Sequence, residues 1–170
     1  MENFFDIPFV LLATNNILDV SFASNYSAIK TAREEAMTMT FKNIKTISPD
    51  QLKDLYLSVD WDSGNHPERL SQAIEGSDSV FTAWDGDKLV GLINVLSDGS
   101  IAAYVHYLLV RPEYQGEGIG KTLVDKVAEA YADCLHVVLV AYNEQIGFYE
   151  QCGFECPTNA SPMFKTSLRI

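Results

Sequence analysis

Runs of apolar residues predict the strands of a β-sheet. Alternation of apolar and polar positions is typical of a strand with one buried face, whereas a short unbroken apolar run is typical of a strand buried on both faces. Asp85-Gly86-Asp87 separates two such runs, and an Asp-Gly pair in this setting favours a hairpin. The predicted strands are residues 38–47, 79–84, 89–96, 102–110, 137–141 and 163–168.

Apolar residues that recur every three or four positions predict helices between these strands. Ser48-Pro49 begins the first helix, because serine is a favoured N-cap and proline fits the first helical turn. We expect this helix to end near residues 61–64. The other predicted helices are residues 67–76, 118–132 and 144–151, and the pattern also allows a helix over 26–37.

The order of these elements predicts an α/β (α+β) fold in a single domain. Hairpins come first and a strand-helix-strand unit follows, which indicates a mixed, mostly antiparallel sheet with helices on both faces. Residues 1–36 differ in composition, with serine and asparagine between apolar stretches, and we assign them as an N-terminal extension of unknown role. Residues 37–170 are assigned as the folded domain.

The composition restricts the class of partner. With 170 residues, of which 47% are hydrophobic and 21% charged, the chain can bury the core of one globular domain. A net charge of −11 argues against nucleic acid as a partner, because phosphates are bound by clustered lysine and arginine. Cationic molecules are favoured instead.

Cys134, Cys152 and Cys156 are an odd number of cysteines without paired ligand spacing. They predict neither a disulfide framework nor a metal site and favour a reducing, cytoplasmic setting. The apolar N-terminal stretch contains Glu2 and Asp6 where a signal peptide needs positive charge, and it is too short to span a bilayer. We therefore expect no targeting segment and no membrane partner.

A glycine-rich loop lies between the strand 102–110 and the helix that starts near Gly118. Gly116, Gly118 and Gly120 let a phosphate group approach backbone N–H groups, and the helix dipole favours its negative charge. A Walker loop is disfavoured because no glycine stands five residues before Gly120. A dinucleotide fingerprint is disfavoured because the spacing is G-x-G-x-G rather than G-x-G-x-x-G.

The segment Gln115-Gly116-Glu117-Gly118-Ile119-Gly120 resembles the Gln/Arg-x-x-Gly-x-Gly/Ala signature of the GNAT acetyltransferases. Residues 108–114 resemble the strand and lead-in that precede this signature. Residues 141–154 resemble the family's second segment, a strand end with Asn and a helix with Phe-Tyr that closes in Gly-Phe. The resemblance extends over 38–168 and implies an N-acetyltransferase that moves acetyl from acetyl-CoA to a primary amine by direct attack in a ternary complex.

The resemblance also implies which residues bind acetyl-CoA. The end of the strand 102–110 would contact the pantetheine arm, and the loop amides would hold the pyrophosphate. Asn143 would bond the pantetheine amides, and Phe148 would pack beside the cofactor. The cofactor-binding residues so assigned are Leu108, Leu109, Val110, Gln115, Gly116, Glu117, Gly118, Ile119, Gly120, Lys121, Asn143, Phe148 and Tyr149.

Tyr149, His106 and Tyr104 are the candidate catalytic residues. The hydroxyl of Tyr149 can protonate the CoA thiolate that leaves when the amine attacks the thioester. The imidazole of His106, with an unperturbed pKa of about 6.5, can accept a proton from the amine, although a packed histidine remains the alternative. A strand period of two places residues 104, 106 and 108 on one face, so Tyr104 would join the same proton path.

Trp61 and Asp62 are assigned to acceptor binding, because the loop between the first two helices commonly lines the acceptor pocket in this superfamily. The acceptor stays open between a small-molecule amine and a protein amine, and the family favours a homodimer. Cys152 has no neighbouring base that would activate its thiol, so packing is its expected role. Two other classes remain, an acyl-CoA-binding regulatory module without turnover and a dimerising interaction protein.

Overall fold

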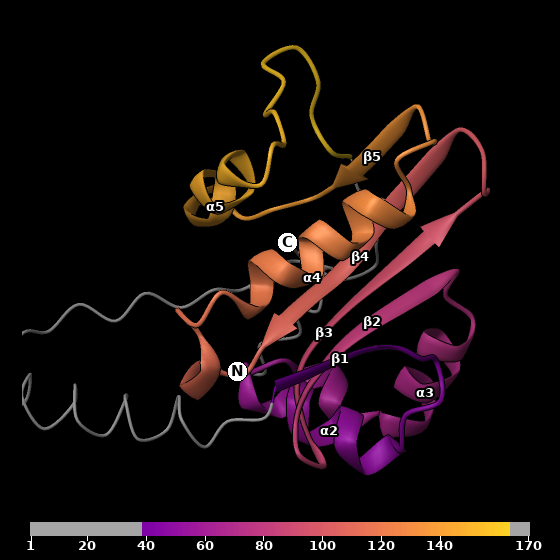
Figure 1. The fold of residues 1–170 in the computed structure, drawn as a ribbon, viewed down its shortest axis with the longest axis vertical. Coiled ribbons are helices and arrows are strands. Elements are labelled where there is room, and N and C mark those ends of the chain that lie inside the picture. Colours follow the sequence, from indigo (N-terminus) through magenta and orange to yellow (C-terminus); the bar gives the residue numbers. More distant parts are fainter. Residues whose placement is uncertain (1–38, 164–170) are drawn as a thin grey trace, which may run out of the picture.

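The computed structural model describes residues 39–163, which form one five-stranded sheet in the order β1-β2-β3-β4-β5 with helices against it (Figure 1). The strands are β1 (Met39–Asn43), β2 (Ser79–Asp85), β3 (Lys88–Ser97), β4 (Ala102–Val110) and β5 (His136–Leu139). The α-helices are α2 (Pro49–Ser58), α3 (Pro67–Glu75), α4 (Ile119–Ala130) and α5 (Ile146–Gln151). Short 3₁₀ helices are η1 (Asp62–Asn65), η2 (Pro112–Tyr114) and η3 (Asn143–Gln145).

The sheet is mixed and mostly antiparallel, as predicted. β1 to β4 pair antiparallel with their neighbours, and β5 pairs parallel with β4 after the crossover through α4. Helices α2 and α3 lie on one face, while α4 and α5 lie on the other (Figure 1). The prediction of helices on both faces is therefore confirmed.

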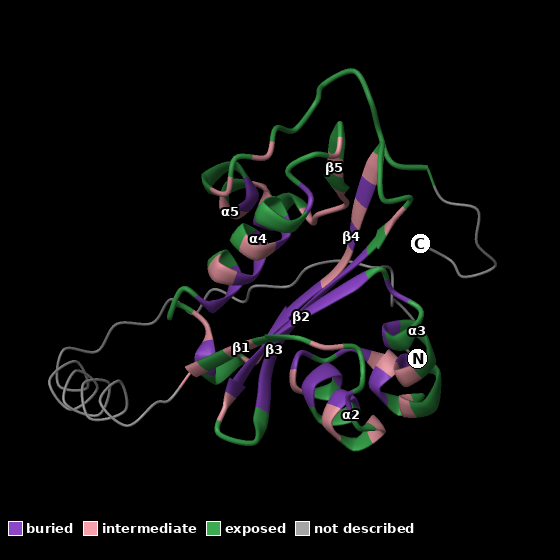
Figure 2. Cartoon of the chain, turned by 45° about the vertical axis from the view of Figure 1, so that its right-hand side comes forward, coloured by how far each residue is buried: buried purple, intermediate pink, exposed green. Residues whose placement is uncertain are grey.

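Alternation along β2 divides the hydrophobic core between the two faces. Phe81 and Ala83 pack in the cluster beneath α4, whereas Val80 and Trp84 pack in the cluster beneath α2 and α3. Burial of one such large side chain contributes about 1.5–3 kcal/mol to folding. Both faces of the central strands are consequently buried, which is visible as the continuous purple of β2 and β3 in Figure 2.

The first helix ends earlier than its sequence pattern predicts. α2 stops at Ser58, Asp60 takes a left-handed backbone conformation with φ of 59°, and the N–H of Trp61 turns back to the carbonyl of Tyr56 at 3.1 Å. Residues 62–65 then form η1. The expected helix 144–151 is divided in the same way into η3 and α5.

Two predicted elements lie outside the described residues. These are the helix over 26–37 and, except for Met163, the strand over 163–168. The N-terminal extension, residues 1–36, also lies outside them.

Candidate active site

The glycine-rich loop is anchored to the hairpin between β2 and β3. The Nε of Arg111 donates to the carbonyl of Leu89 at 2.8 Å, and the hydroxyl of Tyr114 donates to Asp85 at 2.8 Å. A salt bridge of 2.9 Å between Lys88 and Glu113 adds an exposed contact. These contacts fix the position of the loop before any ligand binds.

Two glycines of the loop are required by the backbone conformation. Gly116 and Gly118 have φ of 81° and 77°, and an added Cβ would meet no atom within 4 Å at either position. The constraint is therefore the left-handed backbone, which other residues adopt only at a cost.

Gly118 is also the N-cap of α4, and no side chain caps this helix end. The N–H of Thr122 bonds the carbonyl of Gly118 at 2.9 Å, which closes the first turn. The N–H groups of residues 119–121 lie at the start of the helix, where no preceding helical carbonyl can accept from them. Such a helix end, preceded by glycine, is suited to bind an anion.

The side chains of the loop residues make different kinds of contact. Gln115 donates its amide nitrogen to the carbonyl of Val110 at 2.9 Å, which ties the loop to the end of β4. Ile119 is 4% exposed and belongs to the core, so only its backbone faces the loop. Lys121 is bound to both carboxylate oxygens of Asp125 at 2.9 and 2.7 Å on the exposed side of α4, and Glu117 is exposed.

Gly120 joins the loop to the second motif. An added Cβ at Gly120 would lie 3.5 Å from Phe148, which packs against the core cluster beneath α4. The two segments that resemble the acetyltransferase motifs therefore meet where α4 begins beside α5.

A β-bulge interrupts β4 at His106. Asn94 of β3 pairs with Tyr107 and the next residue, Val95, pairs with Val105, so His106 is the extra residue. Val105 and Leu108 consequently face the same core cluster although they are three positions apart. The expectation that residues 104, 106 and 108 share one face is wrong, because the bulge shifts the alternation after Val105.

The end of β4 can offer only its backbone to a ligand. Leu108, Leu109 and Val110 have side chains no more than 1% exposed. The pairing of β4 with β5 stops at Val105 and Leu139, so within residues 39–163 the β5-side edge of β4 has no strand partner from His106 onward. The two strands diverge at this point, which leaves backbone groups of β4 facing a gap between strands.

Tyr149 lies at the centre of the second motif and is 2% exposed. Its hydroxyl is buried and has no hydrogen-bond partner among the described residues. Burial, with a smaller contribution from Cys152, raises the pKa of the Tyr149 hydroxyl far above its ordinary value of 10.0, so the group stays protonated at neutral pH. A buried, unpaired hydroxyl is costly, so a partner from outside the described residues, such as a bound ligand, would stabilise it.

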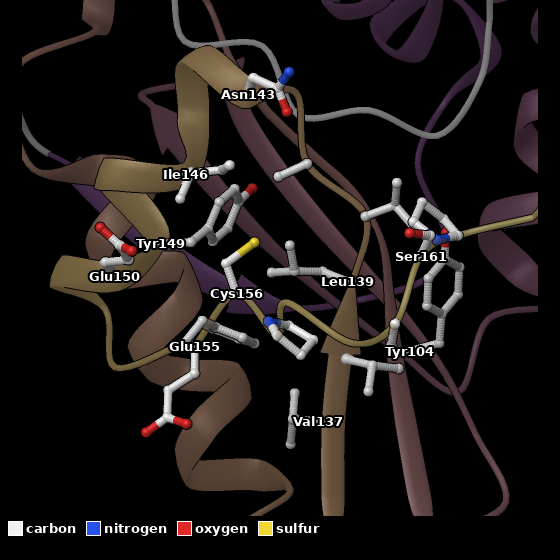
Figure 3. Close-up of a pocket in the computed structure, with 17 residues that line it drawn as sticks. Tyr104, Val137, Leu139, Asn143, Ile146, Tyr149, Glu150, Glu155, Cys156 and Ser161 are labelled. Carbon is white, nitrogen blue, oxygen red and sulfur yellow. The ribbon is translucent and has the colours of Figure 1, made fainter.

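Tyr149 lines a cavity of about 520 Å³ between β5, α5 and the chain that follows α5 (Figure 3). Tyr104 of β4 and the exposed Asn143 also line it, so the structure brings three of the predicted site residues together. Most of the other lining side chains are apolar, including Leu139 and Ile146. The glycine-rich loop does not line this cavity and reaches it through Phe148, whose ring lies 5.0 Å from that of Tyr149.

His106 is half-buried beside the bulge. Its ring centroid lies 3.9 Å from that of Tyr107 and 5.8 Å from that of Tyr104. Burial lowers the pKa of His106 below its ordinary value of 6.5, which keeps the imidazole neutral at neutral pH. Burial raises the pKa of the Tyr104 hydroxyl.

Trp61 lies in the core rather than on an open surface. It is 6% exposed, and its ring packs edge-on against Tyr56 at 5.9 Å and Tyr107 at 5.4 Å. Asp62 begins η1 and is half-buried. Trp61 is thus placed to support Tyr107 and the bulge from behind.

Two residues near the site were not found by sequence reasoning. Asn94 is fully buried, accepts from the N–H of Tyr107 at 3.1 Å, and donates to Ser77 at 2.9 Å, so its side chain holds the bulge. The sequence feature that could have pointed to Asn94 is its position, since it is an asparagine in the middle of an apolar strand. Cys156 lines the cavity with Tyr149, although it stands outside both motifs.

Two features are absent from residues 39–163. Within them, histidine, cysteine, aspartate and glutamate side chains form no group of three that could hold a metal ion. No helix in this part of the chain has the length and apolar character needed to cross a membrane.

Comparison with known proteins gives a consistent family. A family model described as acetyltransferase (GNAT) domain matches residues 43–164. GCN5-related N-acetyltransferase 2, chloroplastic, from Arabidopsis thaliana is 34% identical over 116 residues, which are 66% of this chain and 44% of that protein. An uncharacterized N-acetyltransferase ycf52-like from Prochlorococcus marinus is 30% identical over 123 residues, which are 69% of this chain and 68% of that protein.

Solved structures agree. A GNAT family acetyltransferase from Streptococcus pneumoniae has a TM-score of 0.68 and 29% identity, covering 78% of this chain and 100% of that chain. A putative acetyltransferase from Deinococcus radiodurans has a TM-score of 0.66 and 26% identity, covering 76% of this chain and 88% of that chain. With a family match over more than half of its length, the chain belongs to the GNAT acetyltransferase family.

Proposed function

We propose that this protein transfers the acetyl group of acetyl-CoA to a primary amine by direct attack in a ternary complex. The observation that carries the proposal is the hydroxyl of Tyr149, which is buried, protonated, unpaired among the described residues, and at the wall of a cavity. Family membership supports the reaction class.

The glycine-rich loop is the proposed site for the pyrophosphate of CoA. The N–H groups of residues 119–121 and the positive end of the α4 dipole favour an anion. Lys121 is paired with Asp125, so it would have to leave this exposed pair to contact a phosphate. An exposed pair of this kind is worth only about 0–1 kcal/mol, and the exchange is inexpensive.

The unpaired edge of β4 is the proposed site for the pantetheine arm and the acetyl carbonyl. Backbone groups at Leu108 to Val110 face the gap beside β5 while their side chains stay in the core. Asn143 and Phe148 would hold the arm from the α5 side. Backbone N–H groups on the carbonyl oxygen would stabilise the charge that develops there.

Tyr149 is proposed to assist departure of the thiol. The amine nitrogen forms a bond to the acetyl carbon, the carbon–sulfur bond breaks, and the hydroxyl of Tyr149 donates a hydrogen bond or a proton to the departing sulfur. Because the pKa of Tyr149 is raised, the hydroxyl is fully protonated when it is needed.

His106 is the proposed acceptor of the amine proton, with Tyr104 beside it. The neutral imidazole can take a proton at neutral pH, and the bulge turns His106 out of the regular alternation. Tyr104 lines the same cavity as Tyr149, and its ring lies 5.8 Å from that of His106, which supports a proton path that includes Tyr104.

The acceptor is an amine of a small molecule or of a protein. A relative from Glycine max, 31% identical over 102 residues that are 58% of this chain and 41% of that protein, is named histone acetyltransferase TAP1, which keeps a protein amine among the candidates. Homodimer formation and a cytoplasmic location remain predictions.

Initial-velocity kinetics test the mechanism. With acetyl-CoA varied at several fixed concentrations of an active amine, direct attack predicts double-reciprocal lines that intersect. Parallel lines would indicate an acetylated enzyme and would refute the ternary complex.

A further inference from the structure

Cys156 shares the cavity of Tyr149. It is an exposed, free cysteine on the segment that follows α5, and Figure 3 shows its sulfur pointing into the cavity toward Tyr149 and Leu139. The proposed function places the sulfur of CoA beside the hydroxyl of Tyr149, which lines this open cavity, so a protein thiol and a ligand thiol would lie at the same cavity.

The other two cysteines lie elsewhere. Cys152 ends α5 and is half-buried, and its pKa is raised by burial with opposing effects from Lys121 and Asp125. Cys134 is half-buried near the start of β5 and packs against the core. Neither lines the cavity of Tyr149, so the chain contains two internal controls for any reaction at Cys156.

The unpaired hydroxyl of Tyr149 is the independent sign that this cavity receives a ligand. It is 2% exposed, lines the cavity, and has no partner within residues 39–163. A thiolate or disulfide sulfur is a group that such a hydroxyl can stabilise by hydrogen bonding.

We propose that Cys156 is a site of thiol–disulfide exchange with the disulfide form of CoA, and that the resulting adduct blocks the active site reversibly. The thiolate of Cys156 attacks one sulfur of CoA disulfide, a new sulfur–sulfur bond joins Cys156 to one CoA, and the second CoA leaves as a thiolate that takes up the proton lost by Cys156. A dithiol reductant reverses the exchange. This inference rests on the proposed function, because it requires the CoA moiety to bind at this site.

Positioning distinguishes this reaction from ordinary reactivity of an exposed thiol. Glu150 and Glu155 also line the cavity, and carboxylates disfavour both a thiolate and the approach of an anionic disulfide. In Figure 3 the carboxylate of Glu155 points away from the sulfur of Cys156. A disulfide without affinity for the site is therefore expected to react slowly, whereas one held by its CoA part gains from proximity.

The test is intact-mass spectrometry of the full chain incubated with CoA disulfide or, separately, with glutathione disulfide at equal concentration. We expect a single CoA adduct that forms at least about tenfold faster than the glutathione adduct. Cys156→Ser should abolish it, whereas Cys152→Ser and Cys134→Ser should retain it. Excess acetyl-CoA should slow the reaction, and dithiothreitol should restore both the original mass and the rate of CoA release.

Equal rates with the two disulfides, or an adduct that persists in Cys156→Ser, would overturn the inference. The proposed function has a separate readout, which is binding of acetyl-CoA measured by calorimetry on the reduced protein. Binding without a selective adduct refutes the role of Cys156 alone, whereas absence of binding refutes the proposed function itself.

Discussion

Asn94 holds the backbone of Tyr107 through a hydrogen bond of 3.1 Å between its side-chain oxygen and the Tyr107 N–H. The amide nitrogen of Asn94 donates to Ser77 at 2.9 Å, so both ends of this fully buried side chain are used. The contact spans β3 and β4 at the position where His106 is inserted. The bulge thus has a defined partner on the neighbouring strand.

Replacement of Asn94 by leucine should lower turnover as well as stability. The change removes the acceptor of the Tyr107 N–H, at a cost of about 1–3 kcal/mol for a buried polar group, while the Ser77 hydroxyl keeps its bond to the carbonyl of Ala73. Thr82→Val is the matched control. Thr82 of β2 is also fully buried, and its hydroxyl donates to the carbonyl of Lys42 in β1. Urea denaturation should show both variants destabilised, with kcat reduced only in Asn94→Leu. Equal kcat in the two variants would contradict a role for the bulge.

The pH profile of kcat/KM should reveal whether His106 is the base. Burial lowers its pKa below 6.5, so the neutral, proton-accepting form prevails above that value and is lost as the pH falls. We expect kcat/KM to be flat at neutral pH and to fall on acidification through a pKa below 6.5. His106→Gln should remove this acid limb, and His66→Gln, a change at an exposed histidine, should keep it. An unchanged limb in His106→Gln would identify a packed residue instead.

The lowered pKa of His106 also predicts how the stability of the protein depends on pH. Because the unfolded chain binds a proton at His106 more readily than the folded chain, the stability of the wild type should be lost as the pH falls through the folded pKa. His106→Gln should reduce that loss in urea denaturation measured between neutral and acidic pH.

Gly118→Ala should weaken acetyl-CoA binding beyond its effect on folding. A left-handed conformation costs an alanine about 1–2 kcal/mol, and no atom lies within 4 Å of the added Cβ. Gly99→Ala carries the same strain in the turn between β3 and β4, with φ of 72° and equally open space. Similar loss of stability in both variants, with KM for acetyl-CoA raised only in Gly118→Ala, is the expected result. A KM raised equally in Gly99→Ala would attribute the effect to folding.

Two buried tyrosines of one core cluster should respond oppositely to loss of their hydroxyl. Tyr131 contacts Ser79 at 2.6 Å and donates to Asp78 at 2.5 Å, and its pKa is raised to about 12 chiefly by burial. Tyr131→Phe should therefore cost about 1–3 kcal/mol in urea denaturation. Tyr149→Phe removes an unpaired hydroxyl and should leave stability equal or slightly higher. A comparable loss in Tyr149→Phe would indicate a structural partner for that hydroxyl.

Local sequence patterns predicted the parts of the fold that depend on neighbouring residues. The bounds of β4 follow from its apolar run, and the hairpin at Asp85-Gly86-Asp87 follows from the turn preference of Asp-Gly. Glycine was singled out at positions 116 and 118 because it lets a phosphate approach, whereas the structure shows a different requirement, a left-handed backbone at both residues.

Features that depend on contacts with another part of the chain could not be predicted from local sequence patterns. The bulge at His106 requires a side chain of β3, so a period of two read along β4 misplaced Leu108. The burial of Trp61 depends on Tyr107, which is 46 positions away along the chain. Cys156 enters the cavity only because the chain after α5 turns back toward β5.

The rate of CoA release, followed with a thiol reagent across a panel of primary amines, tests the central claim most directly. We expect turnover of acetyl-CoA with one class of amine and a kcat reduced at least about tenfold in Tyr149→Phe, with the KM for acetyl-CoA little changed, since an interaction made in the transition state is lost. Tight binding of acetyl-CoA without release on any amine, or full activity in Tyr149→Phe, would contradict the account.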